Sequence, residues 1–219
     1  MQVIKFPLYA NIILRVSVFL TTLGYLYRFS DDNLKAFSQI YFEWGFSEQT
    51  AEIVVDIMSG ALWLTLVTLP FRKMRFFSIP GFLALLFELL CLCINSNTQY
   101  SWLVIPNHAL RLTPFLLILI PWRSVTAIRI MTITTVGTFI GHGLKALFTY
   151  PEFIDYILVF YQLINFPIRE ATATILLHTI GIIDITLGLY ILFLQRTRWV
   201  LCYMIFWGLI TALTRLMYY

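Results

Sequence analysis

The sequence predicts an all-helical membrane protein of about seven transmembrane helices, and three observations carry this prediction. The chain of 219 residues is 60% hydrophobic and only 12% charged, with a mean hydropathy of +0.83. Apolar runs of membrane-spanning length recur along it, and basic residues lie at alternate connections between them. Because a soluble domain usually carries about 25% charged and about 45–50% apolar residues, we expect lipid to surround this chain.

Seven segments are apolar and long enough to cross a hydrocarbon core of about 30 Å, which takes about 20 helical residues. The first is too long, and ends in residues too bulky, for a cleavable signal peptide, so we expect it to be retained. The fourth contains three prolines and should be kinked. The segments are residues 8–27, 50–69, 76–94, 102–122, 125–145, 171–194 and 199–218.

The charges of the connections predict an orientation. Basic residues gather on one set of connections and acidic residues on the other. Because Lys and Arg mark cytoplasmic loops, the N-terminus is expected in the cytoplasm and Tyr219 outside. The basic set is Lys5, Arg72, Lys73, Arg75, Arg123, Arg196 and Arg198, and the acidic set is Asp31, Asp32, Glu43, Glu48, Glu152, Asp155 and Glu170.

Two long outer connections, residues 34–44 and 153–164, mix aromatic with polar residues, as helices at a membrane interface do. We expect both to lie on the outer leaflet. The short loops and the absence of NxS/T acceptor sites favour a bacterial inner (plasma) membrane.

Ordered internal matches predict a duplication. LRVSVFLTTLGYLYR from Leu14 aligns with IRIMTITTVGTFIGH from Ile128, and VVDIMSG aligns with IIDITLG, which places Asp56 on Asp184. GFLALLFELL aligns with GLITALTRLM and places Glu88 on Arg215. The predicted organisation is one membrane domain, 1–219, with repeat one at 8–95, a linking helix at 102–122 and repeat two at 125–219. Both three-helix repeats would enter the membrane from the same side, as parallel repeats do.

A sequence pattern that occurs twice resembles DoxX-like membrane proteins. It consists of an acid, small residues three and four positions later, and a leucine-rich run that ends at a basic turn. The first copy has Asp56, Ser59 and Gly60, and the second has Asp184 and Gly188. Both copies have Asp where the family usually has Glu, and Leu187 replaces one small residue. The resemblance implies a four-helix-bundle unit used twice. Its relatives include a subunit associated with thiosulfate:quinone oxidoreduction, partners of redox enzymes, and maturation or cargo factors.

Ionisable side chains inside spans cost about 2.5–3.5 kcal/mol on insertion scales and usually face the bundle interior or water. Counting ~1.5 Å per residue from the segment ends places most of them toward the outer side, with Asp184 deeper. We therefore predict an outer-facing polar pocket near the repeat interface, and the alternative is that these charges only fix helix packing. The candidates are Arg28, Asp56, Glu88, His108, Arg111, His142, Asp184 and Arg215.

The sequence lacks nucleotide-binding, nucleophilic-serine and zincin motifs, and its three cysteines lack metal-ligand spacing. We therefore predict no catalytic residue, no metal and no nucleic-acid partner. The leading interpretation is a non-enzymatic accessory subunit whose pocket binds a small lipophilic or anionic ligand, or a partner protein. Association of the chain with further copies of itself is the alternative to a partner protein. One alternative is a quinone-linked redox component, with quinone or haem near His108, Arg111 and His142. Another is a proton- or ion-coupled transporter using Asp56 and Asp184.

Overall fold

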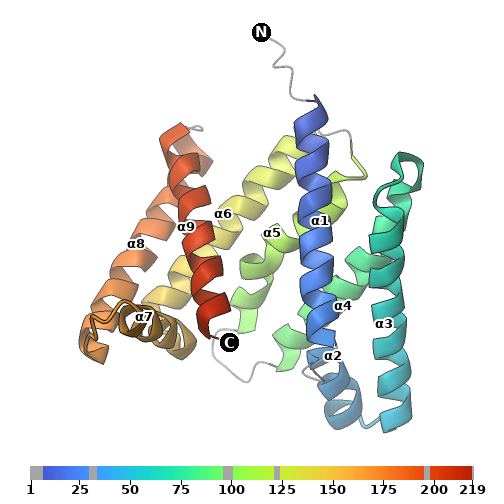
Figure 1. Ribbon diagram of the computed structural model, residues 1–219, viewed down its shortest axis with the longest axis horizontal. Helices are drawn as coiled ribbons and strands as arrows, with labels where there is room; N and C mark the ends of the chain where they lie inside the picture. The colour runs from blue at the N-terminus through green and yellow to red at the C-terminus, as the bar shows by residue number, and fades with distance from the viewer. Residues whose placement is uncertain (1–6, 30–33, 96–100, 121–123, 195–197, 219) are drawn as a thin grey trace. The chain divides into compact units, whose positions relative to one another are not determined.

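The computed structural model describes residues 7–29, 34–95, 101–120, 124–194 and 198–218, and within these ranges the chain is helical without strands (Figure 1). Each of the seven predicted segments contains an α-helix. The helices are α1 (Pro7–Phe29), α2 (Lys35–Ser38), α3 (Glu48–Thr68), α4 (Ser78–Asn95), α5 (Val104–Leu117), α6 (Val125–Leu147), α7 (Pro151–Leu163), α8 (Glu170–Leu194) and α9 (Arg198–Tyr218), with a π-helical turn η1 (Gln39–Glu43) and 3-10 turns η2 (Arg72–Phe77) and η3 (Ser101–Leu103).

Three helical stretches in the described ranges are long and apolar enough to cross a membrane: Glu48–Thr68, Met74–Ile94 and Glu170–Phe193. They indicate an integral membrane protein. In the described part of the predicted segment 102–122, which ends at residue 120, the α-helix is Val104–Leu117, which at 1.5 Å per residue is roughly 21 Å long. Of the charges used to orient the chain, Lys5, Asp31, Asp32, Arg123 and Arg196 lie outside the described residues.

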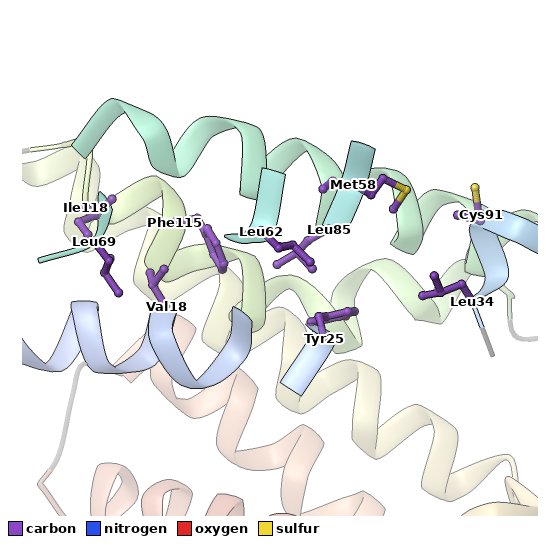
Figure 2. Close-up of a cluster of buried hydrophobic side chains, with 12 residues drawn as sticks. Val18, Tyr25, Leu34, Met58, Leu62, Leu69, Leu85, Cys91, Phe115 and Ile118 are labelled. Carbon is purple, nitrogen blue, oxygen red and sulfur yellow. The ribbon is translucent and has the colours of Figure 1, made fainter. Parts of the chain in front are cut away.

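The chain divides into two compact units, Met1–Met131 and Thr132–Tyr219, and the boundary falls inside α6. Unit 1 contains α1 to α5, and its core collects apolar side chains from all five helices (Figure 2). Val18 of α1, Leu62 of α3, Leu85 of α4 and Phe115 of α5 are completely shielded from solvent. Because lipid is as apolar as these side chains, close packing rather than burial from water holds such a bundle together.

The crossing of α3 and α4 depends on Gly81. The Thr65 hydroxyl donates to the carbonyl oxygens of Ala61 and Phe77, both at 2.9 Å. A Cβ added at Gly81 would collide with Thr65 Oγ1 and lie 3.1 Å from Thr65 Cβ. The glycine therefore leaves room for a threonine that ties α3 to the chain just before α4.

Replacing Gly81 with alanine is expected to lower the free energy of unfolding by about 1–3 kcal/mol, the usual cost of overpacking. Thermal unfolding of the purified variant measures this. Adding Thr65→Ala to Gly81→Ala should recover part of the loss, because it removes the clashing hydroxyl. A Gly81→Ala protein as stable as the parent would contradict the packing.

Unit 2 is held by a close contact between α6 and α8. A Cβ added at Gly143 would lie 2.7 Å from the Gly181 oxygen, and one added at Gly181 would lie 2.8 Å from the Gly143 oxygen. One end of this helix pair is covered by α7, which lies crosswise in Figure 1 and packs Ile154 against Ala146, Ala173 and Leu177. The segment 153–164 that was expected to form a helix is thus largely contained in α7.

The other expected interfacial segment, residues 34–44, forms α2 and η1. Three large aromatic side chains, Phe42, Trp44 and Phe46, are exposed at its end, and Gly45 between them has φ of 69°. That left-handed backbone conformation favours glycine. Exposed aromatic rings of this kind are typical of membrane–water boundaries.

Candidate intramembrane polar sites

Asp184 is the most deeply enclosed acid of unit 2. It lies near the middle of α8, between Gly181 and Gly188, and is 3% exposed. The indole N–H of Trp207, on α9, donates a hydrogen bond to the carboxyl. The Oδ1 atom has no hydrogen-bond partner among the described residues. One half of this carboxyl is therefore satisfied and the other half is not.

The surroundings of Asp184 are aromatic and apolar. Tyr203, one turn before Trp207 on α9, is close enough to the same carboxyl to interact with it electrostatically. The Tyr203 and Trp207 rings are stacked, with centroids 6.4 Å apart and an angle of 13° between their planes. Both pack on a cluster formed by Val136, Phe139, Ile191 and Met204. A carboxylate oxygen in such surroundings is costly unless a donor or a proton meets it.

Glycines on either side of Asp184 let α8 approach α6 closely. A Cβ at Gly188 would lie 3.0 Å from Ile140 Cγ1, and Gly181 touches α6 directly. These two glycines flank the acid by about one turn on each side, so α8 presents the face carrying Asp184 to α6. Close approach through small residues is the usual way membrane helices pack.

Asp56, which the sequence aligns with Asp184, lies in a different environment. Asp56 is exposed, and a Cβ added at Gly60 would meet nothing within 4 Å. The α8 residues Gly181, Asp184, Gly188 and Ile191 are buried, whereas the aligned α3 residues Ile53, Asp56, Gly60 and Trp63 are exposed. Asp56 therefore does not share the burial of Asp184, because α3 turns a different face to its neighbours.

Glu88 anchors the short helix α2. It is 1% exposed, and its carboxylate accepts hydrogen bonds from the backbone N–H groups of Lys35 at 3.1 Å and Ala36 at 2.9 Å. Leu34, at the N-cap position of α2, has no capping side chain. Glu88 thus takes the role that a serine or aspartate usually has at a helix N-terminus.

The alignment of Glu88 with Arg215 stays a prediction. The side chains of Arg28 and Arg215 lie outside the part of the structure that is described. Their helices, α1 and α9, are formed as expected.

Asn107 is a buried polar residue of α5 that sequence reasoning missed. It is 5% exposed, and neither Oδ1 nor Nδ2 has a hydrogen-bond partner among the described residues. His108 and Arg111 follow on the same helix and are half-buried. The only sequence signal was an amide next to His108, and because it carries no charge it was not among the ionisable residues considered.

Polar contacts at the α6–α7 end of unit 2 involve two histidines. The His142 ring lies 5.9 Å from the Phe153 ring, and His178 Nε2 lies 2.9 Å from the Thr149 hydroxyl. Nearby, Lys145 Nζ lies 4.6 Å from the Tyr150 ring centroid. Burial raises the pKa of the Tyr150 phenol above its usual value, and Glu152 raises it further.

The eight predicted site residues thus fall into two groups. The residues of unit 1 are Arg28, Asp56, Glu88, His108 and Arg111, and those of unit 2 are His142, Asp184 and Arg215. Within the described ranges no group of three or more His, Cys, Asp or Glu residues is arranged to hold a metal ion. No protein-family model matches the chain, and comparisons with curated proteins and with solved structures find no match.

Proposed function

We propose that this protein is a non-enzymatic polytopic membrane subunit that binds a small lipophilic ligand in unit 2, through Asp184. The observation that carries the proposal is the half-satisfied carboxyl. Its buried Oδ1 has no partner among the described residues, and the stacked rings of Tyr203 and Trp207 lie beside it. A hydroxyl or ammonium group on an apolar molecule would complete this set of contacts.

The chemistry of the site distinguishes between the lipophilic and the anionic ligand, both of which the sequence leaves open. An anion would meet a carboxylate in an apolar environment, where like charges repel strongly. A neutral or cationic donor would instead be attracted to Oδ1, and a cation would also favour the faces of the two rings. The proposal therefore commits to a lipophilic hydrogen-bond donor at this position.

We propose seven membrane spans in two parallel repeats, with a cytoplasmic N-terminus, in a bacterial inner membrane. The order of elements supports the repeat: α1, a short segment, α3 and α4 have the counterparts α6, α7, α8 and α9. Helix α5 would be the link between them. We also propose that the chain is DoxX-like. That family implies a four-helix unit, and α1, α3, α4 and α5 pack together in unit 1.

Small-molecule mass spectrometry tests the ligand. The protein and the Asp184→Asn variant would be extracted in polymer-bounded native lipid discs, and bound molecules would be quantified per chain. We expect one lipophilic donor molecule near stoichiometric amounts in the parent and a loss of at least about tenfold in Asp184→Asn, since a hydrogen bond to a charged group contributes about 1.5–3 kcal/mol.

Asp56→Asn is the matched control, because it removes an acid at the aligned position on another helix, and it should retain the molecule. Equal amounts in the parent and Asp184→Asn would contradict the proposal. A quinone lost only on replacing His108, Arg111 or His142 would favour the redox alternative. An empty protein whose gradient-driven uptake depends on Asp184 would favour the transporter.

A further inference from the structure

One face of α3 presents an acid against which no described residue of unit 1 packs. This surface, which we call the Asp56 face, is a helical stripe of Ile53, Asp56, Gly60, Trp63 and Val67. Ile53 is 51% exposed, Trp63 is 53% exposed and Val67 is 63% exposed. The opposite side of α3 is buried in unit 1 through Met58, Leu62 and Thr65.

The acid lies at a depth where lipid is a poor neighbour. Helix α3 is long and apolar enough to span a membrane, and Asp56 follows its first residue by a little over two turns, roughly 12 Å along the axis. Asp56 has no hydrogen-bond or ion-pair partner among the described residues. Intramembrane charges usually face other protein groups or water, because exposing them to hydrocarbon is costly.

Gly60 makes the same face suitable for close helix packing. A Cβ at Gly60 would meet nothing within 4 Å, so the glycine serves no contact inside unit 1. In α8, the aligned glycine touches a neighbouring helix and the aligned acid receives a hydrogen bond. The α3 face thus has the small residue and the acid of a helix contact, but no described helix of unit 1 lies against it.

We propose that the Asp56 face docks a transmembrane helix of a partner protein that carries a lysine or arginine opposite Asp56. Charge complementarity selects this occupant, because a cation relieves the cost of the acid and forms a charge-assisted hydrogen bond with it. A second copy docked symmetrically would oppose one Asp56 to another, since a twofold interface joins the same patch on both subunits. Lipid alone would leave the charge unpaired.

Photo-crosslinking in proteoliposomes tests this docking. A photoreactive amino acid replaces Ile57, which is 66% exposed beside Asp56. The probe is a leucine-rich transmembrane peptide with one lysine at the depth of Asp56, compared with the same peptide carrying glutamine. We expect about three to ten times more adduct with the lysine peptide, from the measured range of polar contacts between membrane helices.

Two further variants complete the test. Asp56→Asn should remove the preference for the lysine peptide, whereas Glu52→Gln, which neutralises an exposed acid one turn away on α3, should keep it. Both positions are exposed, so neither change disturbs the packing of unit 1. Equal adduct from both peptides, or a preference that survives Asp56→Asn, would overturn the proposal. Asp56-dependent adducts between two copies of the chain would overturn it in favour of self-association.

Discussion

Replacing Glu88 with leucine is expected to lower the free energy of unfolding by about 3 kcal/mol. The change leaves the backbone N–H groups of Lys35 and Ala36 without the carboxylate that accepts their hydrogen bonds. Each buried donor left without a partner costs about 1–3 kcal/mol, and Ala36 is completely buried. Glu88→Gln should lose less, because its amide oxygen can still accept from one of the two donors.

Limited proteolysis gives this prediction a local readout. Lys35 is exposed, so trypsin can cleave after it once α2 detaches. Cleavage at Lys35 should be much faster in Glu88→Leu than in the parent, with Glu88→Gln between them and Glu52→Gln unchanged. If Glu88→Leu resists trypsin as well as the parent and unfolds at the same temperature, the anchoring role of Glu88 is wrong.

The second large effect is expected at the contact between α6 and α8. In Gly143→Ala the new Cβ would lie 2.7 Å from both the Gly181 oxygen and Ile185 Cγ1, and 3.1 Å from the Ile185 nitrogen. Two of these atoms belong to backbone that cannot turn aside, so the helices must separate. We expect a loss of about 1–3 kcal/mol, and a similar loss for Gly181→Ala.

Thermal unfolding of the parent, the two single variants and the double variant measures this contact. Because both substitutions strain one crossing, the loss in the double variant Gly143→Ala/Gly181→Ala should be less than the sum of the single losses. Gly24→Ala is the control, since its Cβ meets nothing within 4 Å and alanine favours a helix by about 0.5–1 kcal/mol. A Gly143→Ala protein that gains stability as Gly24→Ala does would show that the helices do not touch there.

The helices themselves were predictable from the sequence because a membrane demands long apolar runs. Thus α3 and α8 begin and end within two residues of the predicted segments. The prediction overestimated the α-helical part of residues 102–122. In the described part of that segment Val104–Leu117 is α-helical, with Pro114 inside the helix, and Ser101–Leu103 before it forms a 3-10 turn.

The environment of each polar residue was less predictable. Asp56 and Asp184 have nearly the same local sequence, yet only Asp184 is buried, because burial depends on which face the neighbouring helices cover. The role of Glu88 was also hidden, since its partners are backbone N–H groups far away in the chain. No side-chain pattern marks such partners.

A structure determined from crystals grown in a lipidic mesophase, at a resolution that orders small molecules and water, tests the central claim most directly. The account predicts non-protein density within hydrogen-bonding distance of Asp184 Oδ1, beside Tyr203 and Trp207. An Asp184 side chain whose two oxygens are both bonded to groups of this chain, with no further density nearby, would contradict it.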